Sequence, residues 1–290
     1  MPLYGLIGYP LSHSFSEGYF AEKFRKEGIE DARYKNFPIK NIDELPGLIN
    51  QHPELSGLNV TIPYKEAVIP YLNQLDPDAR EIGAVNTIRI ERQSSITGST
   101  YQKEKADIVN NGSVSNRNPD TKNGDTKWYH SGSKEGNYFL TGYNTDLYGF
   151  ETSLFPLLKP FHQKALVLGT GGASKAVVYA LKRMDIEYRL VSRKPSAEQV
   201  LAYEQITKQV VNNHQIIINT SPLGMYPDVD KCPDLPYEHL SEEHILYDLI
   251  YNPAETLFLQ KGKAKGSIIK NGLEMLELQA EKSWEIWNRE

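Results

Sequence analysis

A glycine-rich turn, GTGGA at residues 169–173, has the residue types that a dinucleotide site requires. It follows the apolar run KALVL at 164–168 and precedes a helical pattern at 174–184. Glycine permits a tight turn and close backbone approach to a pyrophosphate, which binds at a helix N-terminus. Such turns also occur for structural reasons alone. Because a strand and a helix flank this one, we predict a dinucleotide site.

The next predicted strand, 188–191, is followed directly by Ser192-Arg193-Lys194. A site specific for NAD usually offers an acidic residue to the ribose hydroxyls at this point, about 20 residues after the first glycine. Here the chain offers a guanidinium and an ammonium, which suit a 2′-phosphate. Two solvated basic residues in a surface turn are the alternative.

Polar groups also follow a strand in the first half of the chain. In NVTIPYK, residues 59–65, Lys65 lies near the start of a predicted helix, where a cation is mildly unfavourable. Its position therefore indicates a role, although a plain surface lysine is the simpler interpretation. The motif NTD, residues 144–146, precedes an apolar helix and first of all predicts a helix N-cap. Catalysis by Asp146 is the alternative.

Strands that alternate with helices are expected to position these groups in a largely parallel sheet. In the first half we expect strands at 3–8, 34–39 and 58–62, and helices after the N-cap Ser14, at 42–50 and at 64–72.

A second doubly wound α/β pattern follows residue 146. It predicts strands at 164–168, 188–191, 216–218, 245–249 and 267–269, and helices at 147–158, 174–184, 197–208 and 254–261. A closing helix at 273–287 carries an apolar face that could return to the first domain.

Between the predicted hairpin strands 84–90 and 138–142 lies a polar insertion, residues 93–136. It is dense in Ser, Thr, Asn, Gly, Asp and Lys, and has few apolar residues. Such a composition cannot offset the entropy of ordering, so we expect a disordered or protruding segment at a hairpin tip.

Composition excludes several classes of protein. The chain has 290 residues and a formal net charge of −5, which argues against a broad nucleic-acid-binding face. The single cysteine, Cys232, excludes an intrachain disulfide, and no metal-ligand spacing is present. No apolar run reaches the roughly 20 residues of a membrane span, and the first residues lack signal-peptide character. We expect a cytoplasmic protein without a metal, nucleic-acid or membrane partner.

Eight motifs in sequence order resemble the shikimate dehydrogenase family. They are GYPLSHSFS (8–16), NVTIPYKE (59–66), GAVNT (83–87), NTD (144–146), GTGGA (169–173), NTSPLG (219–224), YDLIY (247–251) and NGLEML (271–276). The resemblance covers nearly all of the chain apart from the polar insertion. One such motif is weak evidence, whereas eight in order are strong.

The resemblance implies an α/β fold of two domains with a cleft between them. An N-terminal, mostly parallel substrate-binding domain would comprise residues 1–145 plus 272–290, and a Rossmann-like NADP-binding domain would comprise 146–271. The implied reaction is the reversible, NADPH-dependent reduction of 3-dehydroshikimate to shikimate, a step of aromatic amino-acid synthesis.

The resemblance also implies a role for individual residues. Lys65 and Asp146 would form the catalytic pair, and Ser14 and Ser16 would hold the substrate carboxylate. Contacts to the ring hydroxyls are implied for Thr61, Asn86, Asp146 and Gln279, with Tyr251 closing the pocket. NADP(H) would be bound by Gly169, Gly171, Gly172, Ala173, Ser192, Arg193, Lys194, Leu249 and Gly272.

The chain departs from the family pattern in three places. The familiar Asn-Arg-Thr is Ser192-Arg193-Lys194, and a second arginine is replaced by Ala197. Glu274 stands where the family has glycine, and the insertion at 93–136 is longer than the family's hairpin.

Two other functions compete with this one. A quinate or shikimate dehydrogenase that uses NAD is disfavoured by the missing acidic residue after Val191. A non-catalytic dinucleotide sensor is disfavoured because the chain keeps both Lys65 and Asp146. The partner expected is a small-molecule substrate, and the sequence leaves a homodimer open.

Overall fold

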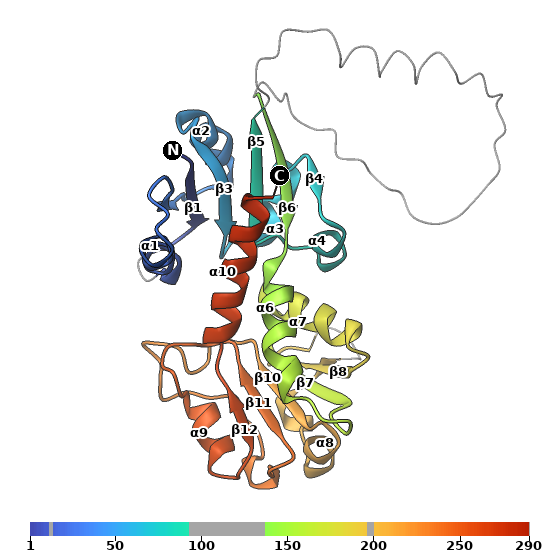
Figure 1. Ribbon diagram of the computed structural model, residues 1–290. Coiled ribbons are helices and arrows are strands. Elements are labelled where there is room, and N and C mark those ends of the chain that lie inside the picture. Colours follow the sequence, from blue (N-terminus) through green and yellow to red (C-terminus); the bar gives the residue numbers. More distant parts are fainter. Residues whose placement is uncertain (12–13, 93–136, 196–199, 290) are drawn as a thin grey trace, which may run out of the picture. The chain divides into compact units, whose positions relative to one another are not determined.

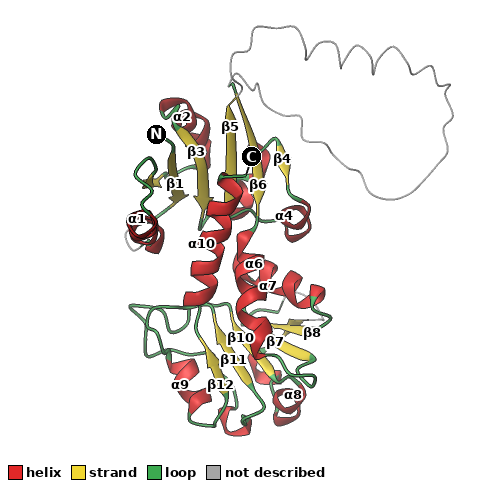
Figure 2. Ribbon diagram, in the orientation of Figure 1, coloured by secondary structure: helices red, strands yellow, loops and turns green. Residues whose placement is uncertain are grey.

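The computed structural model describes residues 1–11, 14–92, 137–195 and 200–289 (Figure 1). The insertion expected at 93–136 and the substitution at Ala197 lie outside these residues. Two six-stranded sheets carry the described part of the chain, with helices packed around them (Figure 2).

The first sheet has the strand order β2-β1-β3-β5-β6-β4. Strand β1 pairs in parallel with β2 and with β3, β4 pairs in parallel with β6, and β3 pairs antiparallel with β5. The expected mostly parallel sheet is therefore present, with β5 as a reversed strand. The strands are β1 (Leu3–Gly8), β2 (Arg33–Pro38), β3 (Leu55–Val60), β4 (Gln74–Leu75), β5 (Thr87–Arg92) and β6 (Tyr138–Tyr143).

Within the described residues, four helices alternate with these strands along the chain: α1 (Phe15–Glu27), α2 (Leu45–Gln51), α3 (Tyr64–Ala67) and α4 (Pro77–Ile82). Ser14 caps α1 as predicted, because its side chain accepts a hydrogen bond from the backbone N–H of Ser16. The helix expected at 64–72 is shorter, since α3 ends at Ala67 and a 3-10 turn follows at Ile69–Tyr71. Sequence reasoning missed α4, although an Asp76 N-cap followed by proline is a standard start signal.

The second sheet has the order β12-β11-β10-β7-β8-β9, and all of its pairs are parallel. Its strands are β7 (Lys164–Leu168), β8 (Glu187–Val191), β9 (Val200–Leu201), β10 (Ile216–Asn219), β11 (Ile245–Asp248) and β12 (Ile268–Lys270). The remaining helices are α6 (Thr145–Leu154), α7 (Gly172–Arg183), α8 (Lys208–Asn213), α9 (Leu257–Lys263) and α10 (Leu273–Trp287).

Helices cover both faces of this sheet, as a doubly wound fold requires. Ala165 and Val167 of β7 pack into one cluster with residues of α6 and α7. Leu166 and Leu168 point the other way, into a cluster with residues of α8 and α9. Both faces are buried, which explains the continuous apolar run of β7.

The helix expected at 197–208 is wrong over its described part. Val200 and Leu201 form β9, which extends the sheet by pairing in parallel with β8. A 3-10 turn follows, and α8 begins only at Lys208, with Thr207 as its N-cap. Pairing with a free sheet edge, and the contact of Leu201 with the core, override the local helical pattern.

Helix α10 spans the predicted residues and packs against the first sheet. The ring of Tyr4 on β1 stacks on Trp287 with centroids 4.8 Å apart, and Phe20 of α1 joins the same cluster. Gly57 of β3 lies so close to the Trp287 indole that no side chain fits there. Helix α10 also packs along α6. Within the described ranges, no helix has the length and apolarity of a membrane span.

Candidate active site

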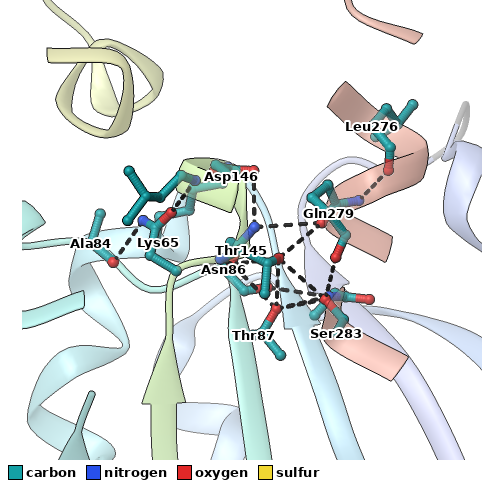
Figure 3. A network of polar contacts seen from close by, with 12 residues as sticks. Lys65, Ala84, Asn86, Thr87, Thr145, Asp146, Leu276, Gln279 and Ser283 are labelled. Atoms are coloured by element: carbon teal, nitrogen blue, oxygen red, sulfur yellow. Dashed lines mark hydrogen bonds and ion pairs between the residues drawn. The ribbon is translucent and has the colours of Figure 1, made fainter. Parts of the chain in front are cut away.

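Lys65 and Asp146, 81 positions apart in sequence, meet at the start of two helices (Figure 3). Lys65 is the second residue of α3 and Asp146 the second residue of α6. The Lys65 Nζ lies 2.6 Å from Asp146 Oδ2, and the side chains are 20% and 13% exposed. This is a short, charge-assisted pair that solvent still reaches. Asn144 is the N-cap of α6, so the cap and the ion pair fall on different residues of the same motif.

Asn86 fixes the other oxygen of the Asp146 carboxylate. Its Nδ2 donates to Asp146 Oδ1 over 2.9 Å, and its Oδ1 accepts from the backbone N–H of Thr145 over 2.7 Å. A backbone N–H can only donate, so the Asn86 oxygen must face Thr145 and the amide nitrogen must face the carboxylate. Asp146 is therefore held at both oxygens.

Gln279 reaches the same cluster from α10. Its Oε1 accepts from the Thr145 hydroxyl at 3.3 Å and lies 3.5 Å from Asn86 Nδ2. Its Nε2 donates to the backbone oxygen of Leu276 at 2.9 Å. Four residues expected at the site from the sequence, namely Lys65, Asn86, Asp146 and Gln279, are thus brought together.

Thr61 directly follows β3, whereas Ser14 and Ser16 lie at the start of α1, the helix that comes after the neighbouring strand β1. The backbone N–H of Thr61 donates to the oxygen of Ile7, which places Thr61 beside the segment that leads into α1. Ser14 and Ser16 flank the first residue of α1. Burial raises the pKa of Tyr34, and a hydrogen bond with the Ser16 side chain acts in the opposite direction. The ring of Tyr251 lies against Phe15, with centroids 5.7 Å apart.

The turn at 169–173 offers backbone groups. Gly169 has φ +117°, a conformation that favours glycine, and a Cβ there would meet Thr220 Oγ1 at 2.7 Å. Gly171 is the N-cap of α7 and makes no side-chain cap hydrogen bond. A Cβ on Gly171 would meet no described atom within 4 Å. A twelve-residue helix therefore starts without a side-chain cap and beside open space, with the Ser174 N–H donating to the Gly171 carbonyl, and this N-terminus fits a pyrophosphate.

The two cations expected at the cofactor site follow β8, next to this turn. Leu168 of β7 is in register with Val191 of β8, so the residues after both strands leave the same sheet edge. Arg193 and Lys194 are exposed, and the Ser192 hydroxyl accepts from the backbone N–H of Lys194 at 3.2 Å. These residues fit a phosphate-bearing ribose.

Leu249 and Gly272 pack against each other. The Leu249 carbonyl lies where a side chain on residue 272 would begin, so only glycine fits there.

Glu274, which stands where the family pattern has glycine, forms an ion pair with Lys270 at the end of β12.

Sequence reasoning assigned no role to Asn219 and Asp248, which end β10 and β11. The buried Asp248 carboxylate accepts from Asn219 Nδ2 at 3.1 Å, from the N–H of Ile250 at 3.1 Å and from the Thr256 hydroxyl at 2.6 Å. Burial raises the pKa of Asp248 to about 6, against the effect of these donors. The two residues brace the loops after their strands. The signal available in the sequence was a polar residue ending each of two apolar strands.

These features define a class of enzyme, the dinucleotide-dependent oxidoreductases. They are two sheets covered by helices, a lysine–aspartate pair, and a glycine-rich turn that leads into a helix without a side-chain cap, with two cations after the next strand. Comparison with known proteins identifies the family. Residues 6–88 match the family model described as shikimate dehydrogenase substrate binding domain. The chain is 37% identical to a Clostridium beijerinckii protein named shikimate dehydrogenase (NADP(+)), over 99% of this chain and 92% of that one.

Two crystal structures agree. Shikimate dehydrogenase 1 from Peptoclostridium difficile is 35% identical, with a TM-score of 0.72, over 99% of this chain and 91% of that one. The Thermus thermophilus enzyme, in complex with NADP(H) and shikimate, is 29% identical, with a TM-score of 0.73, over 99% and 94%. The chain belongs to the shikimate dehydrogenase family, and the resemblance and the fold class inferred from the sequence are confirmed.

Proposed function

We propose that this chain catalyses the reversible, NADPH-dependent reduction of 3-dehydroshikimate to shikimate, with Lys65 and Asp146 as its catalytic pair. The observation that carries this proposal is the 2.6 Å contact between Lys65 Nζ and Asp146 Oδ2, in a chain whose family relatives are NADP(+) shikimate dehydrogenases. Bound NADPH supplies the hydride.

The protein's own part in the reaction is charge stabilisation and proton transfer. Reduction of a ketone places negative charge on its oxygen, and the Lys65 ammonium stabilises that charge and donates the proton. The Asp146 carboxylate holds the ammonium in place, and Asn86 holds the carboxylate. In the direction of shikimate oxidation, the same lysine, now as the neutral amine, receives the hydroxyl proton and becomes the ammonium.

Substrate binding uses polar groups from several elements. Asn86, Asp146, Gln279 and Thr61 would contact the ring hydroxyls. The Ser14 oxygen accepts from a backbone N–H, which leaves its own O–H free to donate to the substrate carboxylate. Ser14 and Ser16 also lie at the N-terminus of a 13-residue helix, which favours an anion.

The proposed division into domains follows the two sheets. Residues 1–145 and 272–290 would form the substrate-binding domain, because α10 packs into the core of the first sheet. Residues 146–271 would form the NADP-binding domain around the second sheet. A cytoplasmic location and a homodimer stay predictions.

An absorbance assay of the reduced nicotinamide, with purified protein, tests the proposal. Shikimate and quinate are each supplied with NADP and with NAD, and each pair is compared with a reaction that lacks the organic acid. We expect shikimate with NADP to give the highest kcat/KM. Faster turnover with NAD and quinate would favour the catabolic alternative, and the absence of turnover in all four would favour a non-catalytic dinucleotide sensor.

A further inference from the structure

Ser283 is a fully buried polar residue on α10, one turn after Gln279, at 0% exposure (Figure 3). Its hydroxyl lies 2.9 Å from the backbone oxygen of Gln279, 2.9 Å from Asn59 Nδ2 and 2.8 Å from the Thr87 hydroxyl. The Thr145 hydroxyl is 3.2 Å away. One serine thus contacts α10, strands β3 and β5, and the start of α6.

The donors and acceptors of this cluster follow from the chemistry of each group. The Tyr34 hydroxyl donates to Asn59 Oδ1 at 2.8 Å, so Asn59 Nδ2 must face Ser283. A serine hydroxyl has one hydrogen and two lone pairs. Because the Gln279 carbonyl oxygen can only accept, Ser283 donates its hydrogen there, and its two lone pairs accept from Asn59 Nδ2 and the Thr87 hydroxyl.

The remaining hydroxyl extends the cluster to the proposed substrate site. With Ser283 satisfied, the Thr145 hydroxyl donates to Asn86 Oδ1 at 3.2 Å or to Gln279 Oε1 at 3.3 Å. Asn86 and Gln279 are the two amides proposed to contact the ring hydroxyls. Buried polar groups of this kind are costly when unpaired and directional when paired.

We propose that Ser283 is a positioning residue for substrate binding. It fixes α10 over the end of β3 and the start of β5, and thereby sets the Gln279 and Asn86 amides at the places where they meet the substrate hydroxyls. Ser283 itself touches no substrate. This inference rests on the proposed function, because it takes the roles of Asn86 and Gln279 from there.

Ser153 supplies a matched control. It is also a buried helical serine, at 1% exposure, that donates to a backbone oxygen one turn earlier, that of Gly149. Its partner hydroxyl is Tyr247, in the core of the second sheet. Ser153→Ala and Ser283→Ala therefore remove the same group from similar surroundings, and only one of the two changes touches the substrate cluster.

The test is the KM for shikimate and the KM for NADP of both variants, with the melting temperature of each. We expect Ser283→Ala to raise the KM for shikimate about fivefold or more, and to leave the KM for NADP within about twofold. Ser153→Ala is expected to leave both KM values within about twofold. Equal KM values in the two variants, or an equal rise for both ligands in Ser283→Ala, would overturn the inference.

Two further variants keep the test decisive. Thr87→Val removes a hydroxyl of the same cluster with little change of shape, and we expect it to raise the KM for shikimate in the same way. This variant takes the place of Ser283→Ala in the test if Ser283→Ala does not fold. Asn86→Ala tests the proposed function separately. If Asn86→Ala leaves the KM for shikimate unchanged, the proposed substrate site is wrong. If it raises that KM while Ser283→Ala and Thr87→Val do not, only the role of Ser283 is wrong.

Discussion

The ends of the strands in the two sheets carry polar groups in different ways. At one edge of the first sheet, Lys65 follows β3, Asn86 directly precedes β5 and Asp146 follows β6, and the side chains of Lys65 and Asn86 both bond to that of Asp146. After β7 and β8 of the second sheet, the chain instead presents the glycine turn and the exposed Arg193. One site is built from side chains that hold each other in place, and the other from backbone shape and exposed charge.

The two buried or half-buried aspartates show the same difference. Asp146 faces a lysine, whereas Asp248 is surrounded by neutral donors from Asn219, Ile250 and Thr256. The first carboxylate has a charge partner for chemistry, and the second supports a loop. A close set of hydrogen bonds around an acid therefore does not by itself indicate catalysis.

The largest expected effect comes from removing the charge of the first site. Lys65→Ala should lower kcat by roughly 10²-fold or more and change the KM for shikimate little, because the ammonium acts chiefly on the transition state. Steady-state kinetics measure both values. Lys26→Ala, which removes an exposed lysine paired with Glu22, is the control. Turnover near that of the unmodified protein would remove Lys65 from the mechanism.

Two glycines test whether the second site depends on backbone shape. Gly171→Ala should raise the KM for both NADPH and NADH by about tenfold and leave the melting temperature unchanged, because its Cβ would occupy ligand space. Gly169→Ala should lower the melting temperature, since φ +117° strains any other residue by about 1–3 kcal/mol. Normal cofactor binding by Gly171→Ala would contradict the comparison of the two sites.

A smaller effect is expected from the exposed guanidinium. Arg193→Ala should raise the KM for NADPH about fivefold and that for NADH hardly at all, because only NADPH carries the 2′-phosphate. Arg189→Ala, which changes an exposed arginine on β8, the strand that precedes Arg193, is the control. Equal losses for the two cofactors would show that Arg193 does not bind the phosphate.

The smallest effect is expected from the polar insertion. Strands β5 and β6 are neighbours in the first sheet, so an Asn-Gly turn in place of residues 93–136 could connect them. Loop-closure entropy varies slowly with length, and we expect kcat and the melting temperature to stay nearly unchanged. Kinetics, thermal unfolding and light scattering measure the outcome. A melting temperature lower by several degrees, a lost dimer or a large fall in kcat would show that the insertion contributes to the fold or to the site.

The sequence predicted the elements whose pattern is local and strong. The run KALVL and the apolar face of α10 gave strand and helix bounds that the structure reproduces. The prediction failed where a sheet edge overrode local pattern, at β9, and where a short helix depended on its cap, at α4. Tertiary pairing that overrides local propensity explains the first failure, whereas the second is a local start signal, Asp76 followed by proline, that was overlooked.

The candidate site was likewise predicted from the sequence only in part. The motifs pointed to Lys65 and Asp146, and the structure brings the two together. The motifs did not point to Ser283, because its partner Asn59 lies 224 positions away and no local pattern links them. One signal was present: Gln279 and Ser283 are polar residues four apart on the buried face of α10.

The packing of α10 also determines the order in which the protein can be completed during synthesis. The strands of the second sheet lie between Lys164 and Lys270, so they can pair before α10 emerges from the ribosome. The first sheet cannot close its core at that stage, because Tyr4, Phe20 and Gly57 pack against Trp287. The half of the protein that is made first can therefore complete its core only after α10 has been made.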